Sequence, residues 1–475
     1  MDQKLWLWSV GLLMLFMQNM ALAALKTQQL PIKEMSKETQ ECVKCHEKNN
    51  PGIVQEWGKS KHYGANVGCY ECHAAEKGDV DAYVHDDKKV KKNISILVTP
   101  KDCGVCHEKA AHEMTSSRHA KAGHILDSLD NLLAEVVEGN RAMVTDGFPG
   151  GNSAAAVNGC WQCHGSKVKV LKDGELDPAT YPNTGIGRIN PDGSEGSCSA
   201  CHSRHGFSAA LAREPDNCGK CHLGPDHPQK EIYEESKHGI AFKAYRDEMN
   251  LDSSKWVVGV DYTAAPTCAT CHMGATKNQP SSHNVGDRIS WTNRPPISVR
   301  PEVMDAKMGL ASADLKWDTR RENMVDVCNS CHSEDHTDKF YIQYDALIEL
   351  YNEKFAKPGK ELMAAAKPLL KPAKFSNKVE WTWFELWHHE GRRARMAASM
   401  QAPDYTHWHG TYDLAKHFYT KMVPELEHLI DENIDSKDAN RAKAAADLRK
   451  KLDEVLSSDN HKWYLGQRDA SAKAK

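Results

Sequence analysis

Several features that would narrow the function of this 475-residue chain are missing from its sequence. Lys and Arg number 61 against 65 Asp and Glu, so neither sign of charge dominates and the net charge is −4. Proteins that bind nucleic acid through its phosphates carry a strong basic excess, and we therefore expect no nucleic-acid partner. Beyond residue 17, the sequence also has no apolar run approaching the ~20 residues that a membrane span needs.

The apolar run that does occur lies at the start of the chain. Leu5 to Met17 follows Lys4 and precedes Ala21-Leu22-Ala23, a small-x-small cleavage pattern. These features are typical of a secretory signal peptide, and they predict that residues 1–23 are removed on export. The mature protein is then expected in the periplasm, soluble or peripheral to a membrane. An uncleaved membrane anchor is the alternative interpretation.

Cysteine is absent outside one repeated motif. All 16 cysteines belong to eight Cys-x-x-Cys-His motifs, so none is left for a disulfide or a nucleophile. The cysteines are Cys42, Cys45, Cys69, Cys72, Cys103, Cys106, Cys160, Cys163, Cys198, Cys201, Cys218, Cys221, Cys268, Cys271, Cys328 and Cys331. The histidines that follow them are His46, His73, His107, His164, His202, His222, His272 and His332.

This spacing is the attachment pattern of c-type haem, in which two thiols form thioethers and the adjacent histidine binds iron as proximal ligand. Zinc sites or disulfides would give no reason for a histidine after every cysteine pair. The sequence therefore predicts eight covalently attached haems. Because covalent attachment of c-type haem is completed outside the cytoplasm, this prediction agrees with export.

Eight haems between residues 42 and 332 leave little room for regular sheet. We predict a mainly α fold with extensive loops, in which a multihaem cytochrome c array over residues 24–340 precedes a helical bundle over residues 341–475. The second part has no cysteine, and helices are predicted at Tyr344–Tyr351, at Glu380–Met400 and over residues 412–456, with a break near Pro424. Apolar residues at helical spacing form a seam in the last of these: Ala445, Leu448, Leu452 and Val455.

Histidines outside the motifs are candidate distal ligands, because a haem that only carries electrons commonly binds a second histidine, whereas a catalytic haem keeps that position open. Six that stand in the haem-rich loops are predicted as such ligands: His62, His85, His119, His205, His238 and His283. A seventh is expected from a C-terminal group: His388, His389, His407 and His409. A surface or capping role is the alternative for each.

The order of the eight motifs and the helical C-terminal part resemble the octahaem hydroxylamine oxidoreductase family over roughly residues 40–420. Local strings that carry the resemblance are His202-Ser-Arg-His205-Gly-Phe, His222-Leu-Gly-Pro-Asp226-His227 and Ser282-His283-Asn284. The resemblance implies that the fourth motif, with His164, holds a catalytic haem whose distal face is open. It also implies that Asp226 and His227 move protons at that haem, although a plain turn is the alternative for this pair.

Two residues bear on the direction of the reaction. In hydroxylamine-oxidising members a tyrosine from a neighbouring subunit is cross-linked to the catalytic porphyrin, which implies a homotrimer; Tyr405 stands in about that place, with a packed aromatic as the alternative. Where those members have a pocket tyrosine, this chain offers Arg294, a fixed cation suited to an anion such as nitrite. Pairing of Arg294 with a haem propionate is the alternative.

Three hypotheses follow for the function. In the first, a periplasmic enzyme interconverts hydroxylamine with NO or nitrite at one open haem while seven haems exchange electrons with a periplasmic or membrane-bound cytochrome, and Arg294 favours reduction. In the second, the chain is a non-catalytic electron conduit in which every haem has two axial ligands. In the third, it reduces a sulfur oxyanion, but the lysine that several such octahaem enzymes use as proximal ligand is lacking.

Overall fold

The computed structural model describes residues 30–87, 90–127, 136, 143–145, 148–152, 159–172 and 174–467. Helices predominate in this part of the chain, and its strands form two two-stranded antiparallel sheets. The predicted mainly α class with extensive loops is therefore confirmed. Across the described residues, no helix combines the length and the apolar character that a membrane span requires. The predicted signal peptide, residues 1–23, lies outside them.

Two compact units make up the chain. The first comprises residues 1–98 with two short returns of the chain, 172–175 and 202–208, and the second comprises residues 99–171, 176–201 and 209–475. The described elements of the first unit are α2 (Lys37–Asn49), α3 (Pro51–Gly58), α4 (Lys61–Gly64), α5 (Cys69–His73), β1 (Tyr83–Asp87) and β2 (Val90–Ile94).

In the first unit, α2 begins where the Ser36 hydroxyl accepts a hydrogen bond from the backbone N–H of Thr39. Thr39 is fully buried, and its own hydroxyl donates to the Glu71 carboxylate of α5 at 2.9 Å. Since α2 carries the first Cys-x-x-Cys-His motif and α5 the second, this contact holds the two motifs together.

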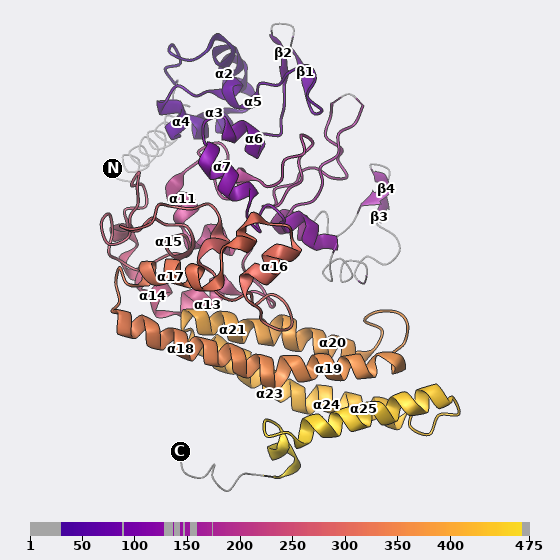
Figure 1. Ribbon diagram of the computed structural model, residues 1–475. Coiled ribbons are helices and arrows are strands. Elements are labelled where there is room, and N and C mark those ends of the chain that lie inside the picture. Colours follow the sequence, from indigo (N-terminus) through magenta and orange to yellow (C-terminus); the bar gives the residue numbers. More distant parts are fainter. Residues whose placement is uncertain are drawn as a thin grey trace, which may run out of the picture. The chain divides into compact units, whose positions relative to one another are not determined.

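The second unit begins with short elements separated by loops (Figure 1). Its helices up to Cys328 are α6 (Pro100–Gly104), α7 (Glu108–Thr115), η1 (Ala122–Asp127), α10 (Cys160–His164), η2 (Cys198–Ala200), α11 (Ala209–Arg213), α12 (Pro215–Gly219), α13 (Gln229–Glu235), α14 (Lys237–Tyr245), η3 (Arg246–Met249), α15 (Cys268–His272), η4 (Val285–Arg288), α16 (Pro301–Lys307), η5 (Ala311–Asp314) and α17 (Trp317–Cys328). Its strands, β3 (Met143–Thr145) and β4 (Phe148–Asn152), form a hairpin.

Longer helices follow from residue 334 and lie side by side in Figure 1. The helices and helical turns of this part are α18 (Glu334–Tyr351), η6 (Asn352–Ala356), α19 (Lys357–Ala366), η7 (Lys367–Leu369), α20 (Lys378–Glu385), η8 (Leu386–Glu390), α21 (Gly391–Met400), α22 (Pro403–Thr406), η9 (His407–Tyr412), α23 (Asp413–His417), η10 (Phe418–Met422), α24 (Val423–Asp431), α25 (Ala439–Ser457) and η11 (Lys462–Leu465). The composition change at residue 341 falls within α18. The expected division into residues 24–340 and 341–475 stays a prediction.

The core of the helical part forms along the seam that the sequence indicated. Leu448 and Leu452 of α25 are fully buried with Leu426 and Val423 of α24. The predicted break near Pro424 is wrong, because the helix continues from η10, a π-helical turn that ends at Met422, directly into α24. The widened turn before Pro424 accommodates a residue that has no N–H to donate. The chain instead leaves the helix after Asp431 and starts α25 at Ala439.

Candidate haem array and catalytic pocket

Three of the eight motifs form single helical turns. In α5, α10 and α15 the helix consists of the five motif residues alone. One turn of about 3.6 residues brings the first cysteine, the second cysteine three residues on and the histidine four residues on to one side. This local geometry presents two thiols and an imidazole together, as covalent attachment of a haem requires.

Four motif histidines face a second histidine at a distance that fits one shared iron. An imidazole nitrogen lies about 2 Å from the metal that it binds, so two imidazoles on opposite faces of one iron have ring centres roughly 6 Å apart. The observed ring-centre distances are 6.1 Å for His46–His85, 6.5 Å for His73–His205, 6.1 Å for His119–His222 and 6.1 Å for His238–His332. These residues fit bis-histidine haems.

Two of the motif histidines are oriented by hydrogen bonds at the ring nitrogen Nδ1. His73 Nδ1 lies 2.7 Å from the Ser95 carbonyl oxygen, and His46 Nδ1 lies 2.8 Å from Asn50 Oδ1. A proton held on Nδ1 leaves Nε2 as the lone-pair nitrogen, which is the usual arrangement around a metal-binding histidine.

His119 and His222 form the most buried of these pairs. Burial lowers the pKa of His119 to about 4 and that of His222 to about 3, so both rings are neutral at pH 7 and able to bind a metal. The His227 ring is also 6.0 Å from that of His222. Its Nε2, however, lies 3.3 Å from Asp226 Oδ2, which favours His119 as the partner of His222.

For the predicted distal ligands His283 and His62, the structure gives contacts other than a ring-centre distance to a motif histidine. His283 lies near His107 of the third motif, and its pKa is lowered by burial with a smaller contribution from the His107 imidazole. His62 stands in the first turn of α4, which the Ser60 hydroxyl caps. The ring centre of His62 is 5.1 Å from the ring centre of Phe207. His238 occupies the same place after Ser236 in α14, so the Ser-Lys-His string presents a histidine from the first turn of a capped helix.

Contacts between cysteines of different motifs show which motifs are neighbours in the second unit. Cys163 and Cys221 are close enough for each thiol to change the pKa of the other, and the same holds for Cys218 and Cys268. Cys201 and Cys218 are close enough to interact electrostatically. The sixth motif therefore adjoins the fourth, the fifth and the seventh, and haems attached there would be neighbours in an electron-transfer chain.

The fourth motif is held by close backbone contacts. The N–H groups of Ile186 and Gly187 donate to the carbonyls of Cys163 and His164 at 3.0 and 3.1 Å. Gly165, directly after the motif, has φ +78°, and a Cβ there would lie 2.4 Å from the backbone nitrogen of Arg188. Only glycine can adopt this positive φ and also leave room for the neighbouring backbone, so Gly165 allows the Arg188 segment to pack closely against the motif that contains His164.

Asp226 and His227 stand on the loop between α12 and α13, where Gly224 with φ +93° makes the turn. Asp226 is near enough to Cys163 of the fourth motif for the two side chains to interact electrostatically. His227 Nδ1 is buried and has no hydrogen-bond partner among the residues that the structure describes. The predicted pair is thus brought together beside the fourth motif with a polar atom that a bound group would satisfy.

Arg392 was not predicted at this pocket from the sequence, and His389 was predicted only as one of a group of possible iron ligands. The Arg392 side chain is 8% exposed; its Nη1 lies 3.5 Å from Asp226 Oδ2, and its Nε and Nη2 donate to the Arg294 carbonyl at 3.0 and 2.8 Å. His389 lies near Asp226, and burial lowers its pKa to about 4. The string His388-His389-Glu390-Gly391-Arg392 was visible, but the π-helical turn η8 that directs it was not.

Arg294 and Tyr405 are placed differently from the other candidates. The carbonyl of Arg294 accepts hydrogen bonds from Arg392 at the pocket. The Arg294 side chain contacts a different residue, since its Nη2 lies 3.6 Å from Met308 Sδ. Tyr405 packs in its own chain against the buried cluster of Ile232, Ala397 and Ala402. The catalytic roles of both stay predictions, as does the role of the remaining C-terminal histidines as iron ligands.

Comparisons with known proteins agree with a multihaem cytochrome. Residues 191–357, which hold four of the eight motifs, match the family "Seven times multi-haem cytochrome CxxCH". Residues 4–99 match the N-terminal region of the NapC/NirT cytochrome c family.

Among curated proteins, a probable nitrite reductase–hydroxylamine oxidoreductase fusion protein of Kuenenia stuttgartiensis is 29% identical over 333 residues. The match covers 62% of this chain but only 34% of that protein, so the chain spans about a third of its length.

Two solved structures are similar in fold. A hypothetical multihaem protein aligns with a TM-score of 0.67 and 26% identity, over 84% of this chain and 95% of that one. A reducing HAO-like protein complex of Kuenenia stuttgartiensis aligns with a TM-score of 0.51 and 19% identity, over 89% of this chain and 87% of that one.

Proposed function

We propose that this chain, a multihaem c-type cytochrome related to hydroxylamine oxidoreductase-like proteins, carries eight haems and reduces nitrite or hydroxylamine at the fourth of them. The observation that carries the proposal is the Asp226–His227 pair beside Cys163, joined by Arg392. The six histidines predicted as distal ligands would serve haems that carry electrons. The fourth haem would have the open face.

The chain's own residues would supply charge and protons at this pocket. When bound, the haem on Cys160 and Cys163 supplies a metal for the substrate nitrogen and a source of electrons. Arg392 gives the pocket a fixed positive charge that attracts an anion such as nitrite. Besides electrons, cleavage of an N–O bond of nitrite requires two protons on the oxygen that leaves as water, and cleavage of hydroxylamine requires one proton on its hydroxyl. Asp226 with His227 is placed to deliver these protons.

Two features support the reductive direction. The cation at the pocket favours an anionic substrate, whereas neutral hydroxylamine gains less from it. Tyr405, the candidate for an oxidative cross-link, packs within its own chain, and its backbone N–H donates to the Glu235 carboxylate at 3.1 Å. We further propose a periplasmic location after cleavage of residues 1–23 and a cytochrome as electron donor. A homotrimer is proposed from the family resemblance alone, without a cross-link through Tyr405.

The test is a ligand titration of the purified, fully haem-loaded chain. We expect the ferric protein to show a high-spin fraction equivalent to one haem in eight, which changes on addition of nitrite, and the reduced protein to consume nitrite or hydroxylamine. A protein in which every haem is low-spin and unaffected by either compound would be an electron conduit instead. Oxidation of hydroxylamine without nitrite reduction would reverse the proposed direction.

A further inference from the structure

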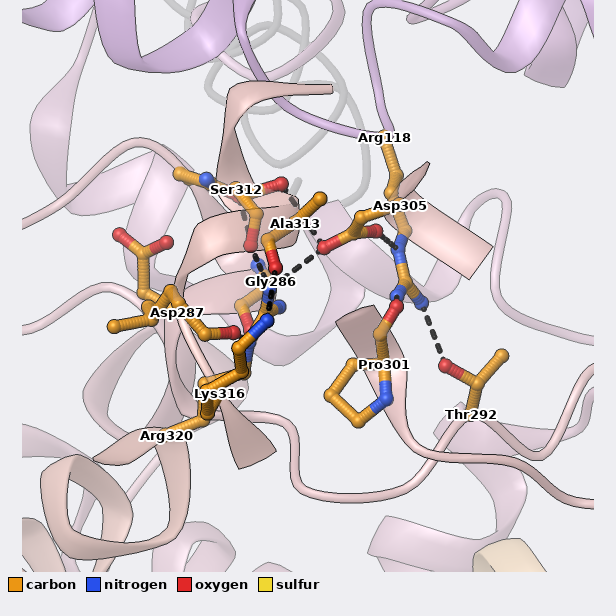
Figure 2. A network of polar contacts seen from close by, with 12 residues as sticks. Arg118, Gly286, Asp287, Thr292, Pro301, Asp305, Ser312, Ala313, Lys316 and Arg320 are labelled. Carbon is orange, nitrogen blue, oxygen red and sulfur yellow. Dashed lines mark hydrogen bonds and ion pairs between the residues drawn. The ribbon is translucent and has the colours of Figure 1, made fainter. Parts of the chain in front are cut away.

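Asp305 of α16 is a buried carboxylate between two arginines (Figure 2). Its side chain is 1% exposed. Arg118 Nε donates to Oδ1 at 2.5 Å, and Arg320 Nη2 donates to Oδ2 at 2.7 Å. The Ser312 hydroxyl also donates to Oδ2, at 2.9 Å. The two arginines and the serine therefore all donate to one carboxylate that is buried away from solvent.

Arg118 fixes a loop that has no regular structure of its own. Besides Asp305, its guanidinium donates to Thr292 Oγ1 at 3.1 Å and to the Pro301 carbonyl at 2.9 Å. Arg118 lies between α7 and η1, and the next residue is His119. The three contacts thus hold the backbone directly beside the imidazole that faces His222 at 6.1 Å.

Arg320 anchors the other side of the carboxylate. Its side chain is fully buried and donates from Nε to the Leu315 carbonyl and from Nη1 to the Gly286 carbonyl, each at 2.9 Å. Asp305 consequently keeps a charged partner when Arg118 is removed. The contact with Arg118 can therefore be broken without leaving the buried carboxylate unpaired.

We propose that Arg118, anchored by Asp305, is a positioning residue that holds His119 in place as the distal ligand of the haem at the sixth motif. An axial ligand presented from a loop binds weakly unless the loop is ordered beforehand, because ordering then opposes binding. The sixth motif adjoins the fourth, fifth and seventh motifs. His119 would therefore set the axial coordination of the haem that lies between three other haems. The inference rests on the proposed ligation by His119 and His222, and not on the reaction.

The test compares three variants of the haem-loaded full chain by electron paramagnetic resonance of the ferric protein. Arg118→Met removes the link to Asp305, and His119→Ala gives the reference spectrum for loss of the ligand. Arg321→Met is the matched control: Arg321 has the same 16% side-chain exposure and pairs with Asp345, which keeps a hydrogen bond from Trp291 Nε1 at 2.7 Å. Haem content and melting temperature are measured for each.

We expect Arg118→Met to convert about one haem in eight from low-spin to high-spin, with the features of His119→Ala, while Arg321→Met keeps the original spectrum at a similar loss of melting temperature. Where Arg118→Met fails to load haem, Arg118→Lys replaces it and should convert a smaller fraction. An unchanged spectrum for the Arg118 variant would overturn the inference, as would equal conversion in both arginine variants. A His119→Ala spectrum identical to the original would overturn it too, since His119 would then not be a ligand. No outcome depends on turnover, so failure of the proposed reaction is recognised separately.

Discussion

At the residue scale, the pocket depends on a small number of charges brought together from distant parts of the chain. Asp226 comes from the loop before α13, and Arg392 comes from α21, 166 residues later. His227 directly follows Asp226 in the sequence, His389 precedes Arg392 by three residues, and both histidines lie near the Asp226 carboxylate. Substitutions here are expected to change turnover more than stability.

Asp226→Asn should lower the turnover number for nitrite reduction roughly 100-fold or more, the usual contribution of a positioned proton donor or acceptor. The amide keeps the shape of the carboxylate but cannot accept and release a proton. Steady-state kinetics with an excess of reductant provide the measurement. Asp216→Asn is the matched control, because Asp216 is an exposed carboxylate of the neighbouring helix α12 that pairs with Lys230. Equal activities of the two variants would contradict a proton-transfer role.

At the scale of elements, α16 and α17 meet through the buried pair of Asp305 and Arg320. Burial alone would raise the pKa of Asp305, but Arg118 and Arg320 hold it below its usual value. A carboxylate with a lowered pKa in the folded state contributes stability above its unfolded pKa of about 4, and that contribution is lost as the pH falls toward the folded value.

Asp305→Asn should therefore melt at a lower temperature than the original chain at neutral pH, with the gap narrowing below about pH 4. The reason is that a protonated Asp305 is neutral, as asparagine is. Calorimetry of both proteins across this pH range measures the gap. A gap that stays constant down to the lowest accessible pH would show that the ionised form contributes no stability.

The seam between α24 and α25 is the second element to test. Leu448→Ala should destabilise the helical part by about 2–5 kcal/mol, because Leu448 is fully buried and its removal leaves a cavity. Haem content should not change, since the elements that pack most closely against α25, namely α19, α24, η7 and η11, carry no motif. Lys443→Ala on the exposed face of α25 is the control and should stay within about 0.5 kcal/mol. Chemical unfolding followed by circular dichroism distinguishes the two.

At the scale of the whole molecule, the proposals concern haem number and covalent links between chains. Denaturing mass spectrometry should give separate chains that each carry eight haems, with no Tyr405 peptide attached to the haem on Cys160 and Cys163. This outcome follows from the packing of Tyr405 within its own chain. A cross-linked dimer or trimer mass would contradict it, and would favour hydroxylamine oxidation by a modified haem.

The sequence by itself determined the chemistry of attachment. Cys160, Cys163 and His164 are three positions of one helical turn, so their arrangement is local and needs no tertiary contact. The same holds for the histidines of the Ser-Lys-His strings, because a serine cap fixes the first turn in which the histidine stands. The helical class and the Leu448–Leu452 seam were likewise set by local periodicity.

The tertiary structure decided which histidine faces which, and what surrounds the pocket. His119 meets His222 across 103 residues of sequence, and no spacing rule selects that partner from the 17 histidines outside the motifs. Arg392 lies beside Asp226 because the π-helical turn η8 precedes it, and Asp305 contacts Arg118 although the two are 187 residues apart in sequence. Such contacts depend on how loops close over long separations, which local propensity does not encode.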